Sequence, residues 1–307
     1  MGILTGLGAR GSGLGSSGIG VWGRSGQALV VLAALLAVSI ATAQERPARI
    51  ISLIPAVTEM LFAIGAGGSV VAVSSFDTYP PQVRDLERVG ALLDPDLERI
   101  LALKPDLVAI YASQTDLARQ LERAGIATYE YRHGGLKDVL TTIRGLGARV
   151  SRGQEAARAA AEIDAGLDRI RRRVDGRPRP KTLLVFGREA LAIRGVYASG
   201  GAGFLNDMLI AAGGENVFAD VRRESVQATS ELILARRPEV ILELRAEGLP
   251  GDRRRAEIDV WRRLSSVPAV RANRVYFIAD PRTVVPGPRV VEGTELIARA
   301  LHPEAFE

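Results

Sequence analysis

Short apolar runs alternate along this chain with longer stretches in which apolar residues recur every three or four positions. Four such runs in the first half predict buried strands at residues 49–54, 70–73, 107–111 and 126–131. The amphipathic stretches between them predict helices. Strands that alternate with helices form a parallel, doubly wound sheet. The first half of the chain therefore predicts one α/β lobe.

One helix-to-strand pattern occurs twice in the chain. Residues 98–108 and residues 231–241 each read as an amphipathic helix that stops at a proline and turns into a short apolar strand. Five of the eleven positions are identical between the two copies. Copies so far apart predict two Rossmann-like α/β lobes with parallel sheets rather than one continuous sheet. A site between paired lobes is a natural place to hold a small molecule.

The second lobe follows the same alternation of apolar and amphipathic segments. An apolar run predicts its first strand at residues 182–186, and a glycine-rich segment then leads into a helix at 204–212. After the second copy of the repeat, the pattern predicts a helix at 261–267, a strand at 274–278 and a terminal helix at 292–300.

A long amphipathic stretch separates the two lobes. Residues 151–154 read Ser-Arg-Gly-Gln, which predicts a capping box, and the helical stripe that follows ends at Asp175-Gly176. About 24 residues at 1.5 Å each give a helix of roughly 36 Å, which suits a single bridge between lobes. The predicted division is a signal peptide at 1–43, an N-terminal lobe at 44–150, a connecting helix at 151–178 and a C-terminal lobe at 179–307.

The first residues indicate where the protein works. Residues 28–41 are a largely apolar run, with Arg10 and Arg24 before it and Ala41-Thr42-Ala43 at its end. This layout is typical of a secretory signal peptide cleaved before Gln44, and it predicts a periplasmic protein. The alternative is an uncleaved membrane anchor, although a bilayer span normally needs roughly 18 or more apolar residues.

The counts of cysteine and histidine exclude several kinds of site. The sequence has no Cys, so it offers no disulfide, no thiolate metal site and no lipid-modified N-terminal cysteine, and we expect a free protein rather than a lipoprotein. It has only two His, which excludes an imidazole cluster for bare zinc, although one His or Tyr can still bind a haem iron. We expect His302 at the surface. His133 follows a strand, where it either faces the cleft or packs in a loop.

Net charge and known catalytic motifs narrow the function class. The net charge is +5, but the arginine runs at 171–173 and 253–255 have no interleaved aromatic residues, so we expect solvated helix faces and no nucleic-acid partner. The mature chain has no Gly-x-Ser-x-Gly elbow, His-Glu-x-x-His motif or phosphate loop, which argues against an enzyme. A signalling module that senses a ligand with the same two lobes is a further alternative.

Several segments, in this order, resemble the periplasmic binding proteins of ABC importers for cobalamin, haem and ferric siderophores, and most closely the cobalamin-binding branch. The resembling segments are 51–59, 74–81, 97–108, 213–218 and 231–238. The resemblance implies a monomer that captures a metal-bearing corrinoid or chelate between its lobes, needs no cofactor of its own, and docks onto a permease and ATPase complex at the inner membrane.

The resemblance also implies that one glutamate on each lobe contacts the permease. The matching positions are Glu98 and Glu231, which are equivalent in the internal repeat. The residues themselves predict that Asp96 and Thr229 are N-caps, which puts each glutamate in a first helical turn. The alternative is that each glutamate only complements its helix dipole, worth about 0.3–1 kcal/mol.

Ligand contacts are expected from loops at the carboxyl ends of the strands, where open α/β sheets bind ligands. Phe76 and Tyr79 lie on such a loop and can stack on a flat ligand. The other candidates share this kind of position, with ordinary packing as the alternative for each: Leu92, Tyr111, Arg188, Tyr197, Gly200, Gly201, Arg222, Arg223, Glu243 and Arg245.

The sequence departs from the cobalamin branch at aromatic positions. The tryptophans expected near Leu92 and near Val226 are absent, and Phe76 stands where a tyrosine is expected. Arginines at 188, 222, 223 and 245 favour a more anionic ligand, because the planar guanidinium pairs with carboxylates and catecholates. We therefore expect cobalamin first, with a ferric siderophore or haem as the alternative.

Overall fold

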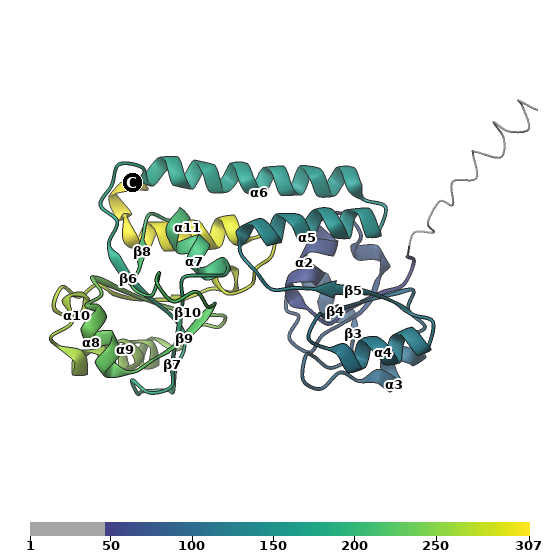
Figure 1. The fold of residues 1–307 in the computed structure, drawn as a ribbon, viewed down its shortest axis with the longest axis horizontal. Coiled ribbons are helices and arrows are strands. Elements are labelled where there is room, and N and C mark those ends of the chain that lie inside the picture. The colour runs from purple at the N-terminus through teal and green to yellow at the C-terminus, as the bar shows by residue number, and fades with distance from the viewer. Residues whose placement is uncertain (1–46) are drawn as a thin grey trace, which may run out of the picture. The chain divides into compact units, whose positions relative to one another are not determined.

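The computed structural model describes residues 47–307 (Figure 1). The predicted signal peptide at 1–43 lies outside the described residues, so its cleavage stays a prediction. Within 47–307, no helix combines the length and the apolar composition that crossing a bilayer requires. The described chain contains two sheets, and helices cover both faces of each sheet.

The first lobe is built on a five-stranded parallel sheet in the order β3-β2-β1-β4-β5. Its strands are β1 (Ile50–Ser52), β2 (Val70–Val73), β3 (Glu87–Arg88), β4 (Leu107–Tyr111) and β5 (Ala127–Tyr131). The central strands are apolar on both sides because helices cover both faces of the sheet. All four predicted strands of this lobe are confirmed, and only the two-residue edge strand β3 was not expected.

Four helices cover this first sheet. Helices α2 (Pro55–Ala63) and α5 (Leu136–Arg149) pack on one face, and α3 (Leu97–Ala102) and α4 (Thr115–Arg123) pack on the other. Pro55 is the first residue of α2, where its missing N–H removes no helical hydrogen bond. The sequence analysis did not predict α5.

The second sheet is mixed rather than parallel. Its order is β11-β10-β6-β7-β9, and β8 also pairs with β6. The predicted parallel pairing holds for β10 with β6 and with β11, but β7 runs antiparallel to both β6 and β9. The segment between β6 and β7 is too short for a parallel crossover, which needs a dozen or more residues. The strands are β6 (Lys181–Gly187), β7 (Val196–Ser199), β8 (Glu215–Asn216), β9 (Ser225–Ala228), β10 (Val240–Arg245) and β11 (Val275–Ala279).

Helices cover both faces of this second sheet as well. They are α7 (Phe204–Ala211), α8 (Ser230–Arg236), α9 (Gly251–Asp259), α10 (Pro268–Arg271) and α11 (Val290–Leu301). The helix predicted at 261–267 is wrong, because that segment is a 3-10 turn followed by a new helix that begins at Pro268. The described 3-10 turns are η1 (Gly67–Ser69), η2 (Pro81–Asp85), η3 (Val260–Leu264), η4 (Pro281–Thr283) and η5 (Pro303–Ala305).

The internal repeat forms the same structural unit in both lobes. Helix α3 leads into β4, and helix α8 leads into β10. Just after each helix, one residue adopts the left-handed backbone conformation. It is Lys104 after α3, with a φ of 47°, and Arg237 after α8, with a φ of 49°. The acidic residue two positions later then bonds to the start of the neighbouring strand. The backbone N–H of Asp106 donates to the carbonyl of Arg49, just before β1, at 2.9 Å, and the backbone N–H of Glu239 donates to the carbonyl of Lys181, the first residue of β6, at 2.7 Å. The repeat therefore predicts local geometry as well as lobe number.

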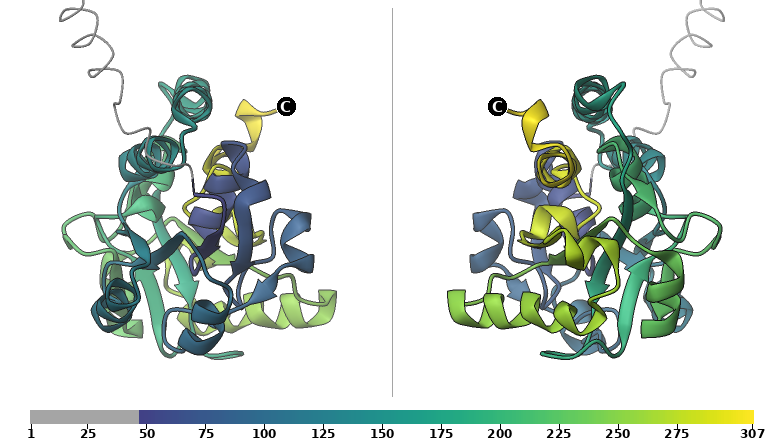
Figure 2. Two further views of the ribbon diagram at one scale, coloured as in Figure 1. Left: turned by 90° about the vertical axis from the view of Figure 1, so that its right-hand side faces the viewer. Right: turned by 90° about the vertical axis from the view of Figure 1, so that its left-hand side faces the viewer.

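Helix α6 (Gly153–Val174) connects the two sheets. It packs on α5 of the first lobe and on α7 and α11 of the second (Figure 1). The side views show α6 end-on, above α5 and α11 (Figure 2). The predicted buried stripe is confirmed, and α6 ends at Val174 before a left-handed Gly176. The predicted capping box is wrong, because Ser151 is itself left-handed and the N-cap is Arg152, which makes no side-chain cap.

Candidate functional site

Aromatic side chains form a continuous series of contacts from the first lobe to the second. The ring centre of Tyr111, at the end of β4, lies 5.8 Å from the ring centre of Tyr131, at the end of β5. The Tyr131 hydroxyl lies 3.3 Å from Nδ1 of His133. The His133 ring in turn packs edge-on against the ring of Phe204, the first residue of α7, with 5.2 Å between the ring centres. The carboxyl end of β5 therefore faces the amino end of α7 across the two lobes.

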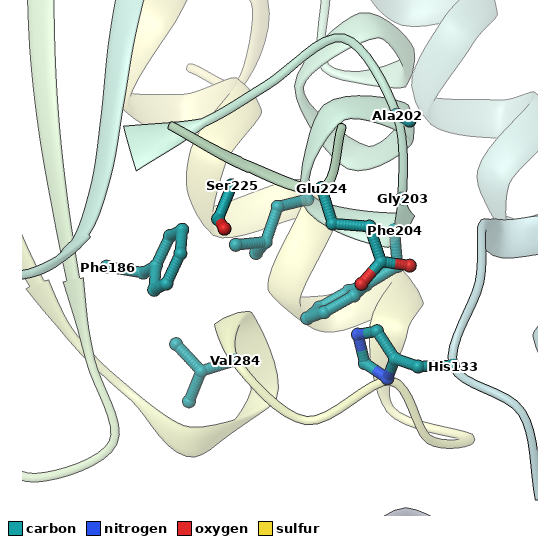
Figure 3. Close-up of a pocket in the computed structure, with 9 residues that line it drawn as sticks. His133, Phe186, Ala202, Gly203, Phe204, Glu224, Ser225 and Val284 are labelled. Atoms are coloured by element: carbon teal, nitrogen blue, oxygen red, sulfur yellow. The ribbon is translucent and has the colours of Figure 1, made fainter. Parts of the chain in front are cut away.

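A pocket of about 380 Å³ lies beside this contact between the lobes (Figure 3). This volume is within the usual range of small-molecule sites, about 300–1,000 Å³. Aromatic and aliphatic side chains make up most of its wall, and its polar side chains come from three residues. The lining residues are His133, Phe186, Ala202, Gly203, Phe204, Leu205, Glu224, Ser225 and Val284.

A glycine-rich loop before α7 shapes one wall of this pocket. A Cβ on Gly200 would lie 2.2 Å from the Arg223 carbonyl oxygen, and a Cβ on Gly201 would lie 2.2 Å from that of Ala219. Gly203 has a φ of +85°, which only glycine adopts readily. The loop can therefore pack against the segment that carries Glu224. Gly200 and Gly201 support the pocket wall and do not line it.

Two further links join the lobes near the pocket. Arg289, just before α11, forms a two-point ion pair with Glu59 of α2, with Nε 2.8 Å from Oε2. Its guanidinium also lies 3.8 Å from the centre of the Tyr79 ring. Burial raises the pKa of the Glu59 carboxyl, and the hydrogen bonds from Arg289 act in the opposite direction. In the second link, the backbone N–H of Leu136 donates to Asp207 Oδ2 at 2.9 Å, so a residue of α7 caps α5.

The predicted ligand residues of the first lobe lie on loops near this site. Phe76 is 73% exposed and Tyr79 is 41% exposed, and Tyr79 faces the second lobe through Arg289. Leu92 is held to the loop after β4, because the side-chain amide of Gln114 donates to its carbonyl at 3.1 Å. None of the predicted ligand residues of either lobe lines the 380 Å³ pocket, so their contact with a ligand stays a prediction.

Two of the predicted arginines belong to a buried charge cluster instead. The Arg188 side chain is 0% exposed and pairs with Glu243 at 3.0 Å and with Glu257 at 2.8 Å. Glu243 also accepts from Arg245 at 2.6 Å and from the indole N–H of Trp261 at 3.2 Å. Arg188 is therefore enclosed and fully paired, which gives it a structural place rather than a ligand-facing one.

Tyr197, Arg222 and Arg223 lie closer to the pocket. Tyr197 packs at a tilt beside Phe186, with 6.4 Å between ring centres, and Phe186 lines the pocket. Arg222 and Arg223 are exposed in the loop that leads to Glu224. These residues are near the site, although they do not form its wall.

The two histidines have different surroundings. His133 lines the pocket, one of the positions the sequence left open for it. The surface position expected for His302 is wrong, because this residue is 3% exposed and its Nε2 lies 3.2 Å from the Gly213 carbonyl after α7. Among residues 47–307, no group of three or more His, Asp or Glu side chains is placed to hold a bare metal ion.

The sequence analysis missed Phe186, Phe204, Glu224 and Val284 as site residues. Phe186 ends the apolar run of a predicted strand, and Phe204 follows a glycine-rich loop, so the rule that ligands bind at carboxyl ends of strands points to both. No sequence signal points to Glu224 or Val284. Their contribution depends on how two distant loops pack.

The candidate docking glutamates occupy equivalent places on α3 and α8. The predicted N-caps are confirmed: Asp96 accepts from the Arg99 N–H at 3.0 Å, and Thr229 accepts from the Leu232 N–H at 3.2 Å. Glu98 and Glu231 therefore both lie in first helical turns. Hydrogen bonds to the Glu231 carboxyl, from the Glu231 backbone N–H and from the Thr229 hydroxyl, lower the pKa of that carboxyl. Docking through these residues stays a prediction.

The chain matches the family model described as "Periplasmic binding protein" over residues 50–281. An uncharacterised ABC transporter substrate-binding lipoprotein of Bacillus subtilis (strain 168) is 29% identical over 271 residues, which cover 87% of this chain and 83% of that protein. The vitamin B12-binding protein of Salmonella typhimurium (strain LT2) is 32% identical over 240 residues, which cover 77% of this chain and 86% of that protein.

Solved structures show the same architecture. The periplasmic vitamin B12 binding protein of Vibrio cholerae superposes with a TM-score of 0.71 at 25% identity, over 85% of this chain and 99% of that chain. A periplasmic haem-binding protein from Roseiflexus sp. RS-1 superposes with a TM-score of 0.70 at 26% identity, over 84% of this chain and 98% of that chain.

Proposed function

The chain belongs to the periplasmic binding protein family, and we propose that it captures cobalamin between its lobes and delivers it to an ABC permease. Proteins of this family are non-enzymatic substrate-binding components of ABC importers of the cobalamin, haem and siderophore type. The partners are therefore a membrane permease with its ATPase and a small-molecule ligand. We further propose that the protein acts as a monomer and needs no cofactor, because the metal belongs to the ligand.

The observation that carries this proposal is the largely apolar pocket between the lobes. Phe186 and Phe204 provide aromatic surface, and Val284 adds an aliphatic contact (Figure 3). Such a wall suits the apolar surface of a large ring system, since aromatic contacts are worth about 0.5–1.5 kcal/mol beyond area burial. The exposed Phe76 and Tyr79 supply further aromatic surface for parts of a ligand that extend beyond the pocket.

Two of the four arginines that favoured an anionic ligand are already paired, and the other two, Arg222 and Arg223, are exposed beside the pocket. The sequence favoured such a ligand because of four arginines. In the structure Arg188 is buried in ion pairs, and Arg245 is paired with Glu243. A paired guanidinium attracts an incoming anion less than a free one, because its charge is already largely neutralised.

Haem is the second candidate, and His133 is the specific reason. Its ring lines the pocket, and its Nδ1 is held near the Tyr131 hydroxyl. The other ring nitrogen, Nε2, is the atom left to bind a haem iron at an axial position. A ferric siderophore remains a further member of the same ligand class.

Titration calorimetry of the purified protein with cyanocobalamin, haem and a ferric siderophore tests the proposal. We expect heat of binding and a raised Tm with cyanocobalamin. No heat with cyanocobalamin, together with haem binding whose absorption spectrum changes in His133→Ala, would replace cobalamin with haem as the ligand. Tyr276→Ala, a change at a ring outside the pocket, is the control for effects on folding.

We also propose that the protein is exported through a cleaved signal peptide and works free in the periplasm. The relative from Bacillus subtilis is a lipoprotein, whereas this sequence has no cysteine that can carry a lipid. Sequencing of the mature protein from a periplasmic extract should begin at or within a few residues of Gln44. Retention in the membrane fraction with Met1 intact would reject this part of the proposal.

A further inference from the structure

Glu224 brings a negative charge to the wall of the pocket. Among the lining residues, it is the only Asp, Glu, Lys or Arg. Figure 3 shows its carboxylate on the same side of the pocket as Phe204 and His133. Its Cγ lies 3.0 Å from where a Cβ on Gly203 would be, so the glycine leaves room for the Glu224 side chain to lie along the wall.

The charge of Glu224 also acts on the opposite lobe. Burial is the largest cause that raises the pKa of the Tyr131 hydroxyl, and the Glu224 carboxylate is one of the charges that raise it further. Tyr131 belongs to β5 of the first lobe, and Glu224 belongs to the second. A ligand between them therefore lies within range of the Glu224 charge.

Three arginines of the second lobe are already engaged by other carboxylates, whereas Arg222 and Arg223 are exposed in the loop before Glu224 and do not line the pocket. Arg188 and Arg245 pair with Glu243. Arg289 forms a two-point ion pair with Glu59. The two carboxylates and three guanidiniums of these pairs lie outside the residues that line the pocket, so Glu224 carries the charge among the lining side chains.

We infer that Glu224 makes this pocket select ligands that present amide N–H donors and reject ligands that present carboxylates. An amide N–H can donate a charge-assisted hydrogen bond to Glu224, which is stronger than a neutral one. A ligand carboxylate would bring a like charge next to it, which is unfavourable. The corrin rim of cobalamin carries amides, whereas haem carries propionates.

This inference rests on the proposed function, because it requires that the ligand occupies the pocket. Two matched ligand pairs test it: cyanocobalamin with its derivative in which one amide is hydrolysed to a carboxylate, and haem with its dimethyl ester. We expect the unaltered protein to prefer the neutral member of a pair by about tenfold, a difference that a like charge at a partly exposed site can produce. Glu224→Gln should remove most of that preference.

Glu215→Gln is the matched control. Glu215 is an exposed glutamate on β8, which pairs with β6 at Lys181, and the pocket contacts the other end of β6 at Phe186. This control should keep the full preference for the neutral ligands. Glu224→Arg should reverse the preference, and thermal melts of all three variants verify that they fold.

The outcomes separate the inference from the proposed function. If cyanocobalamin binds, and the preference for the neutral member of the pair is the same in the unaltered protein and in Glu224→Gln, the role of Glu224 is overturned and the proposed function stands. Binding of only the haem pair, with a preference for the ester that Glu224→Gln removes, would support Glu224 and reject cobalamin. Failure of all four ligands to bind would overturn both.

Discussion

At the scale of single residues, exposure separates side chains that can gain contacts from those already packed. Phe76 is 73% exposed on the loop after β2, whereas the Arg188 side chain is 0% exposed. A ligand can therefore bury new surface on Phe76 and gain little from Arg188. The exposed fraction of each side chain therefore ranks the candidate ligand contacts, which the sequence alone treats as equivalent.

If cobalamin binds, Phe76→Ala should weaken its affinity by about 1–3 kcal/mol through lost aromatic burial. Calorimetric titration with cyanocobalamin measures the change. Leu191→Ala removes an exposed apolar side chain of the second lobe that is not among the predicted contacts, so it should leave the affinity unchanged. An unchanged dissociation constant in Phe76→Ala would remove this residue from the ligand site.

Asp77 on the same loop predicts a pH dependence of stability. Burial raises the pKa of its carboxyl, against hydrogen bonds from Ser74, and its Oδ1 is buried without a hydrogen-bond partner in the described residues. A raised pKa in the folded state means that the contribution of Asp77 to stability is present at low pH and is lost as pH rises through that pKa. Asp77→Asn does not titrate and keeps an oxygen for Ser74.

The unfolding free energy of Asp77→Asn, relative to the unaltered protein, should therefore increase as the pH rises above about 3.9, the ordinary pKa of an aspartate. Urea denaturation at several pH values measures this difference. Asp85→Asn, at an exposed position in η2, should show no such trend. A difference for Asp77→Asn that is flat or falls as pH rises would contradict the assignment.

At the scale of elements, the repeat gives α3 and α8 the same capping and the same exposed side chains. Glu98 and Glu231 are one equivalent pair, and Leu101 and Leu234, each 38% exposed, are another. Because the capping side chains satisfy the helix ends, the glutamates are not needed as N-caps. This leaves their carboxylates available to a partner.

Charge reversal in Glu98→Lys or in Glu231→Lys should weaken association with the permease and slow uptake, while ligand affinity stays nearly unchanged. Each contact is worth a few kcal/mol if it is desolvated and much less at an interface rim. Glu122→Lys, at an exposed position on α4, is a matched control. Association is measured with the permease in detergent or nanodiscs. Loss of ligand binding in Glu98→Lys would place that residue in the ligand site.

At the scale of the described molecule, three features resist movement between the lobes. Helix α6 packs on both lobes, and bending it would break successive backbone hydrogen bonds. Arg289 bonds to Glu59 across the lobes, and Asp207 caps the amino end of α5. We therefore expect limited lobe motion when a ligand binds.

Small-angle scattering profiles with and without cyanocobalamin should differ little. Arg289→Met combined with Asp207→Ala removes both side-chain links and should increase the difference. Arg282→Met, which removes an ion pair with Asp280 inside the second lobe, is the control. A large compaction of the unaltered protein on binding would argue for flexible connections instead of a rigid helix.

Local patterns in the sequence were enough to predict the strands of the first lobe, the internal repeat, the N-caps Asp96 and Thr229, and the buried stripe of α6. These features depend on residues within a few positions of one another, so hydrophobic period and capping chemistry determine them. The capping box at Ser151 failed because the end of α5 imposes a left-handed turn there.

Only the tertiary structure decided which side chains form the pocket and which charges are paired. Glu224 and His133 line the same pocket although they are 91 residues apart in the sequence, and Arg188 reaches Glu243 at a separation of 55 residues. The choice of β6 and β9 as the pairing partners of β7 likewise depends on how the strands come together in the sheet. Such contacts follow from the packing of whole elements, in which burial of apolar faces fixes where distant loops meet, and no local period encodes them.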